Sequence, residues 1–271
     1  MGSWRVTVLD HRRLGGGRPQ GLPEGPLARR DGVELHVRGG GLACVDATGT
    51  VRWQRPCPGR PNAAHLFADR ALVTTDPVGH AAPGGFGPAL LLDLADGRTV
   101  AEPRGERGAA LDDGRFVLGP QGPGTFDTLA YDRDGTPVDA WPSCGHYVAD
   151  GGLRVVETDR RHPTGSRVVR LLPGGRVESG PLLADPQAPA PLVLPDGTLL
   201  VLDAGVLLAV GRDLDDAVLA ELLPLSPGER PRFTGALHRT ADRLDVTLVE
   251  RHPTRMGAYT THGWTLGLHP S

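Results

Sequence analysis

One hairpin pattern recurs along this chain at intervals of about forty residues, and it limits the possible folds more than any other feature. An alternating apolar strand is followed by a turn containing Asp or Gly, and then by a second strand. Further strand pairs with their own turns lie between these hairpins, so each repeat holds four strands, which predicts one blade of a β-propeller. The hairpins are LACVDATGTVRWQRP (42–56), LLLDLADGRTVAEP (90–103), LAYDRDGTPVDAWP (129–142) and VVRLLPGGRVESGP (168–181).

Six such repeats fit into the 271 residues, and the sixth contains only three strands. The alternating segment SWRVTVLD (3–10) has the pattern needed to supply the missing strand. We therefore predict an all-β chain that forms a single six-bladed β-propeller closed by its N-terminal strand, which removes exposed sheet edges. Seven blades are the alternative, with residues 4–24 starting a blade of their own. The predicted blades are approximately 25–57, 63–103, 108–142, 145–181, 190–224 and 232–269 together with 3–10.

The first of these hairpins, ACVDATGTVRW, resembles the PQQ-type repeat of the quinoprotein-like β-propellers. That repeat has an aliphatic strand, an Asp, a Thr-Gly pair and a strand bearing Trp, here Asp46, Thr48, Gly49 and Trp53. The resemblance implies an architecture that covers nearly the whole chain. It implies no bound quinone, because no quinone ligand can be mapped onto this sequence. Two other hairpins match in part, through Asp93 and Gly97 and through Asp132, Gly135 and Trp141.

Composition excludes several functional classes. A net charge of −3 argues against general nucleic-acid binding, and no apolar run is long enough to span a bilayer or act as a signal peptide. Three irregularly spaced cysteines form no disulfide framework, so we expect a reduced, cytoplasmic protein. We also expect the protein to be a monomer. The chain contains no Lys and no Ile, as expected of a GC-rich bacterial genome, and this excludes a lysine nucleophile.

A short motif, His-x-x-Ala-Asp, occurs three times, beginning at His65, His146 and His238. These histidines fall in the second, fourth and sixth repeats, at a position expected near the start of the strand that lines the propeller channel. Three imidazoles converging from alternate blades would hold one divalent transition metal, Cu, Zn or Fe, with open positions for substrate. A structural ring of hydrogen-bonded histidines, carried by duplication of a two-blade unit, and a chance alignment remain alternatives.

An acidic residue follows each of these histidines by 11 or 12 positions, at the end of the next strand. We expect Asp76, Glu157 and Glu250 to accept a proton from the second ring nitrogen and so to orient each metal ligand.

Long loops follow the same strands, and they bring a second set of histidines, His80, His162 and His252, as candidate catalytic groups. Arg161 and Arg251 neighbour two of these and are candidates for binding an anionic substrate, and Cys144 is a candidate ligand or nucleophile beside His146. Ordinary duplicated surface loops, arginines that only provide solubility and a buried structural cysteine are the alternatives. We expect further arginines on the face of the propeller where these loops emerge, namely Arg60, Arg104, Arg107, Arg160, Arg230, Arg232 and Arg255.

Two functions are therefore expected from the sequence. The first is a metal-dependent enzyme of redox, lyase or hydrolase type, which acts on a small anionic molecule or peptide above a three-histidine centre. The second is a non-catalytic propeller that binds a protein or peptide partner, since propellers also serve as interaction platforms.

Overall fold

The computed structural model describes most of the chain, and its contacts divide the chain into two compact units. Unit 1 comprises residues 1–20, 154–170 and 178–271, and unit 2 comprises 21–153 and 171–177; each is considered by itself. No helix in the described part of the chain is long and apolar enough to cross a membrane. The described residues are 4–14, 26–76, 87–119, 121–122, 125–158, 165–185, 188–223, 233–240, 242–251 and 259–270.

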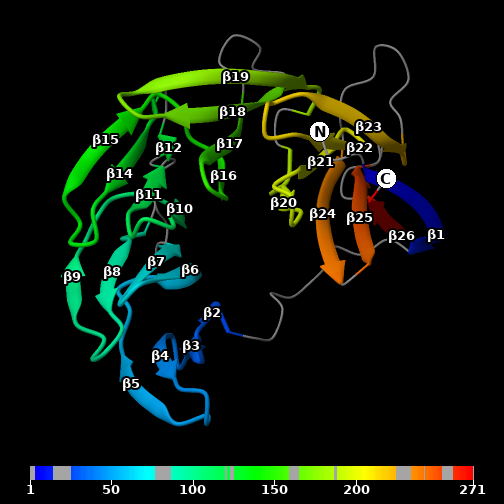
Figure 1. Ribbon diagram of the computed structural model, residues 1–271. Helices are drawn as coiled ribbons and strands as arrows, with labels where there is room; N and C mark the ends of the chain where they lie inside the picture. Colours follow the sequence, from blue (N-terminus) through cyan, green and yellow to red (C-terminus); the bar gives the residue numbers. More distant parts are fainter. Residues whose placement is uncertain are drawn as a thin grey trace. The chain divides into compact units, whose positions relative to one another are not determined.

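Six four-stranded antiparallel sheets follow one another along the chain, and we number them as blades 1 to 6 (Figure 1). A two-stranded hairpin, β12 (Gln121–Gly122) and β13 (Thr125–Phe126), is inserted in blade 3. Blade 1 consists of β2 (Ala28–Arg30), β3 (Val33–Arg38), β4 (Gly41–Val45) and β5 (Val51–Arg55). Blade 2 consists of β6 (Arg60–Phe67), β7 (Arg70–Asp76), β8 (Leu90–Asp93) and β9 (Thr99–Ala101). Blade 3 consists of β10 (Arg107–Ala110), β11 (Phe116–Gly119), β14 (Thr128–Tyr131) and β15 (Pro137–Trp141). Blade 4 consists of β16 (His146–Ala149), β17 (Leu153–Thr158), β18 (Ser166–Leu172) and β19 (Arg176–Leu183). Blade 5 consists of β20 (Leu192–Val193), β21 (Leu199–Asp203), β22 (Val206–Val210) and β23 (Asp216–Glu221).

Blade 6 is completed by the N-terminal strand. It contains β24 (Phe233–Thr240), β25 (Arg243–Arg251) and β26 (Tyr259–Pro270), and β1 (Trp4–Leu14) pairs with β26 along its whole length. The predicted six-bladed β-propeller closed by its N-terminal strand is thereby confirmed, and the seven-bladed alternative is wrong. The closing strand is longer than predicted, because its pairing continues past residue 10 after a bulge between Val8 and Asp10.

Aspartates form the hairpin turns that the sequence pattern marks. In blade 1, Asp46 Oδ1 accepts the N–H groups of Thr48 (2.9 Å) and Thr50 (3.0 Å) and the Thr48 hydroxyl (2.6 Å). In blade 3, Asp132 Oδ1 accepts the N–H group of Thr136 in the same way, at 2.8 Å. Gly49 has a φ of 84°, a value that glycine adopts without steric cost, which explains the Asp-x-x-Gly spacing.

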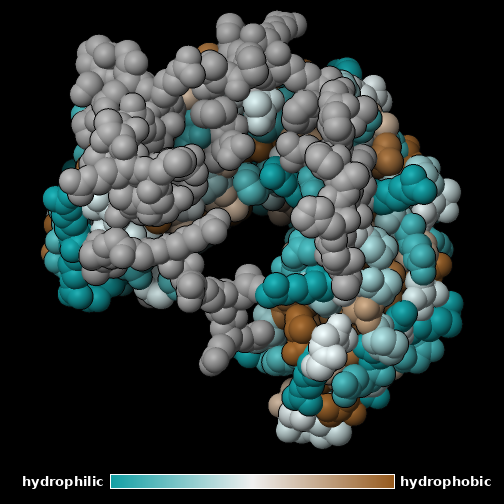
Figure 2. All heavy atoms as spheres, turned by 180° about the vertical axis from the view of Figure 1, so that it is seen from behind, coloured by the Kyte–Doolittle hydropathy of each residue, from teal (hydrophilic) through white to brown (hydrophobic). Residues whose placement is uncertain are grey.

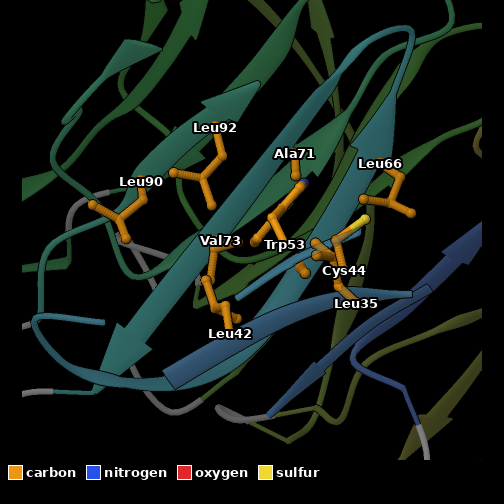
Figure 3. Packing of buried hydrophobic residues seen from close by; sticks show 10 residues of the cluster. Leu35, Leu42, Cys44, Trp53, Leu66, Ala71, Val73, Leu90 and Leu92 are labelled. Atoms are coloured by element: carbon orange, nitrogen blue, oxygen red, sulfur yellow. The ribbon is translucent and has the colours of Figure 1, made fainter. Parts of the chain in front are cut away.

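Neighbouring blades of unit 2 pack through apolar faces, as the contact between blades 1 and 2 shows (Figure 3). Trp53 of β5 lies in this cluster and donates its indole N–H to the carbonyl oxygen of Leu94 at 3.0 Å. Trp141 of β15 makes the equivalent bond to the carbonyl of Leu172 at 2.7 Å. The tryptophans of the repeat therefore join one blade to the next. The cluster consists of Leu35, Leu42, Cys44, Trp53, Ala64, Leu66, Ala71, Val73, Leu90 and Leu92.

The Ala-Asp pair that ends the histidine motif forms a two-residue turn in blade 2, and a buried arginine follows it. Ala68 has a φ of 48°, and Phe67 pairs with Arg70 across the turn. The Arg70 guanidinium is within 2.8 Å of Asp69, 3.2 Å of Asp93 and 3.4 Å of Asp134, so it ties blade 2 to the Asp134 turn of blade 3. Part of the motif therefore has a structural role.

Candidate functional site

The three histidines of the motif occupy different positions in their strands. His146 is the first residue of β16, as expected, whereas His65 and His238 are each the sixth residue of an eight-residue strand. The expectation that all three lie near a strand start is therefore wrong for these two, because β6 and β24 begin earlier than the pattern indicates. His65 and His146 are half-buried, and His238 is exposed.

No group of three or more His, Cys, Asp or Glu side chains in the described part of the chain is arranged to hold a metal ion. His65 and His146 belong to unit 2 and His238 belongs to unit 1, so the predicted three-histidine centre would need residues of both units and stays a prediction. Burial lowers the pKa of His65, and burial together with Arg107 lowers the pKa of His146 to about 4. Both rings are therefore neutral at pH 7.

Strand register separates two of the acids from the histidines they were predicted to orient. His65 lies opposite Leu72, whereas Asp76 lies opposite Arg60. At about 3.4 Å per residue, four residues along β7 amount to roughly 14 Å. A carboxylate at that separation cannot hydrogen-bond to the His65 ring, so the predicted pairing is corrected. The tight turn at Ala68 causes this separation, because it fixes which residues of β6 and β7 lie opposite one another.

The same correction applies to blade 6. His238 lies opposite Asp245, and Glu250 lies opposite Phe233, five residues further along β25. The Glu250 carboxylate is instead 3.4 Å from Nε2 of His262, a buried histidine of β26. The third acid, Glu157, is a half-buried residue of β17.

His80, His162, His252 and Arg161 lie outside the described residues, and Arg251 is described only as the last residue of β25. Their proposed roles stay predictions.

Unit 2 brings together a different group of polar side chains, at the start of β10. The strands β6, β10 and β16 are the first strands of their blades, and β10 lies beside both of the others. Arg107 begins β10, is half-buried and lies opposite Gly119 of β11. Within the described part of the chain its guanidinium has no hydrogen bond or ion pair. Its charge adds to the lowering of the pKa of His146 by burial, and it opposes the rise that burial causes in the pKa of Tyr147.

Gly119 makes room for the side chains that face Arg107. A Cβ atom at this position would overlap the Tyr147 hydroxyl and the Cys144 sulfur. Opposite residues of an antiparallel pair share one face of the sheet, so Arg107 projects from the same face as these two groups. Arg107, Cys144 and Tyr147 therefore lie on one side of the start of β10, and Arg107 is close enough to His146 to lower its pKa; we call these four residues the Arg107 site.

Hydrogen bonds fix the direction of the Tyr147 proton. Thr128 donates its hydroxyl to the carbonyl oxygen of Ser143, and its oxygen lies 2.9 Å from the Tyr147 hydroxyl. A hydroxyl has one proton, so Thr128 must accept at this contact and Tyr147 must donate. Burial, with a contribution from Cys144, raises the pKa of Tyr147 well above its usual value, so the phenol stays protonated.

The Arg107 site has the chemistry of a receptor for an anionic group. Arginine offers five N–H donors in a planar fork that suits carboxylate and phosphate oxygens. A neutral His146 can add a hydrogen bond without requiring a counter-ion. Sequence reasoning placed Arg107 among the arginines of this face and Cys144 beside His146, but it missed Gly119, Thr128 and Tyr147.

Hydrophobic and hydrophilic side chains alternate on the described part of the face drawn in Figure 2. In Figure 2 the described residues show hydrophobic side chains as separate spots among hydrophilic ones. Isolated apolar side chains are normal on protein surfaces. Among the described residues, the exposed large hydrophobics are Val8, Leu9, Val37, Val51, Val138, Val177, Leu182, Val193 and Val218, most of them on the outermost strand of a blade.

Comparison with known proteins identifies a fold and no family. No protein-family profile matches the chain, and no curated protein is similar to it in sequence. Among solved structures, Hsv2 from Kluyveromyces lactis has a TM-score of 0.53 and 11% identity over 85% of this chain and 81% of Hsv2. BamB from Moraxella catarrhalis has a TM-score of 0.45 and 17% identity over 86% of this chain and 81% of BamB. The gluconolactonase XC5397 from Xanthomonas campestris has a TM-score of 0.45 and 13% identity over 88% of this chain and 82% of XC5397. The likeness to Hsv2 is one of fold alone, in keeping with the six-bladed β-propeller described above.

Proposed function

We propose that the protein is a ligand-binding β-propeller that takes up a small anionic molecule, or the carboxylate of a peptide, at the Arg107 site. The observation that carries this proposal is a half-buried guanidinium with no anionic partner in the described part of the chain, beside a neutral imidazole. Desolvation of an unpaired charge is costly, and an incoming anion offsets that cost.

Binding of simple anions tests this proposal. Isothermal titration calorimetry with inorganic phosphate, acetate and succinate should give saturable binding of at least one of them at low ionic strength. Arg107→Gln should weaken that binding at least about tenfold, the usual effect of losing a charge-assisted hydrogen bond. Arg52→Gln is the matched control, because Arg52 is exposed on β5 and lies outside the site. Equal affinities of the wild type and Arg107→Gln would refute the proposal.

A metal-dependent enzyme is the second candidate. His65 and His146, with His238, would hold one divalent Cu, Zn or Fe ion, and the neutral state of the first two rings favours ligation. Elemental analysis of the purified protein should then give one metal per chain, and His146→Ala should remove it. The binding proposal instead expects anion affinity to survive treatment with a chelator.

We further propose a monomeric, cytoplasmic protein without nucleic-acid or membrane partners, related in architecture to the quinoprotein-like propellers. The composition and the Asp46–Trp53 hairpin support this setting. Light scattering coupled to size-exclusion chromatography should give a mass close to 28.6 kDa.

A further inference from the structure

A β-bulge at the start of β10 brings an acid beside Arg107. Arg107 lies opposite Gly119 in the β10–β11 ladder, and the N–H group of Glu106 donates to the carbonyl oxygen of the same Gly119 at 3.3 Å. Two residues of one strand that oppose a single partner form a bulge, and bulges next to functional sites re-aim side chains. Glu106 and Arg107 are both half-buried, and their side chains leave the strand next to each other.

The neighbouring charges of Glu106 and Arg107 are not joined in an ion pair within the described part of the chain. Burial raises the pKa of Glu106, and the charge of Arg107 opposes that rise. The guanidinium therefore keeps its donors for a ligand, while the Glu106 carboxylate adds a negative charge beside the place where an anion would bind.

The described contacts bring a single cationic donor to this site, and it is Arg107. Tyr147 cannot supply a further donor, because its hydroxyl proton is directed to the Thr128 oxygen at 2.9 Å. His146 has no acidic partner among the described residues, and an imidazole without such a partner is neutral near pH 8. The positive charge available to a ligand is therefore that of one guanidinium.

We propose that the Arg107 site selects monoanionic carboxylates over dianions, and that Glu106 is the residue that sets this selectivity. This inference rests on the proposed function for the binding of an anion, and it adds the charge class of the ligand. Once one carboxylate has neutralised Arg107, the charge that remains at the site is that of Glu106, so a second negative charge on the ligand is repelled. Solvent screens this repulsion only in part, because both residues are half-buried.

Matched pairs of compounds test the selectivity by isothermal titration calorimetry at low ionic strength and about pH 8, where the carboxyl groups are ionised. Succinamate and succinate share one carbon chain, as do glutaramate and glutarate, and an amide replaces the second carboxylate in the first of each pair. The monoanion of each pair should bind the wild type at least about threefold more tightly than the dianion. Glu106→Gln should reduce this ratio at least about threefold, because repulsion by Glu106 acts mainly on the dianion. The bond to Gly119 uses the backbone of Glu106, so this substitution retains the bulge.

Glu178→Gln is the control variant, because it removes the same charge from a residue that pairs with Arg170 on blade 4, outside the site. It should keep the wild-type ratio. Equal or tighter binding of the dianions to the wild type would overturn the inference and leave the anion site intact. A ratio that persists in Glu106→Gln, or that Glu178→Gln changes as much, would also overturn it. If none of these compounds binds, the inference fails, and the titrations with phosphate and acetate show whether the proposed function fails with it.

Discussion

Arg107 lies directly opposite Gly119 in the β10–β11 ladder, and this pairing creates the candidate site. The missing side chain of Gly119 admits the Tyr147 hydroxyl and the Cys144 sulfur from the next segment of the chain. The β10–β11 pair of blade 3 thus sets the position of the Tyr147 and Cys144 side chains, which follow later in the chain.

Gly119→Ala should therefore destabilise the protein by about 2 kcal/mol, because the new methyl group would force the Tyr147 and Cys144 side chains to move. Urea denaturation followed by tryptophan fluorescence measures this. Gly152→Ala is the matched control, because a Cβ atom there meets nothing within 4 Å. If the two variants proved equally stable, Tyr147 and Cys144 could not be packed against Gly119.

Arg70→Met should cost about 3 kcal/mol of unfolding free energy. Its side chain is 9% exposed, and removal would leave Asp69, Asp93 and Asp134 without their shared cation. Arg133→Met is the comparison, because Arg133 pairs with Asp69 but its side chain is 55% exposed, so its loss should cost less than about 1 kcal/mol. Similar losses in both variants would contradict the structural role given to the buried arginine.

His146 should make the wild-type protein less stable in mild acid. Its pKa is about 4 when folded and about 6.5 in an unfolded chain, so the unfolded state binds the proton more readily. Stability is then complete above about pH 6.5 and falls as the pH drops toward 4. His146→Asn should flatten this pH dependence by about 1–2 kcal/mol, measured by denaturant titrations at pH 7 and pH 4.5.

The fold could be predicted from the sequence because its signals are local. Asp46 and Gly49 specify a turn through bonds within five residues, and the alternating strands on either side specify the pleat. The closing strand was also predictable, because the sixth repeat lacks one strand and the segment after Ser3 has the right alternation.

The site was less predictable because it depends on register and on contacts between blades. An interval of 11 residues between His65 and Asp76 suggests proximity, but the tight turn after Phe67 places them at different levels of the hairpin. Gly119 carries no sequence signal of its own, because its role follows from its partner Arg107 and from side chains of another blade.

The most direct test of the account is the resonance of the Arg107 side chain in solution. The Nε–Hε signal of Arg107, assigned through Arg107→Gln, should move progressively when the tightest anion of the calorimetric panel is added, and the Arg52 signal should stay in place. Saturation at the calorimetric affinity is the predicted result. A signal from Arg107 that does not respond while the anion binds elsewhere would contradict the central claim.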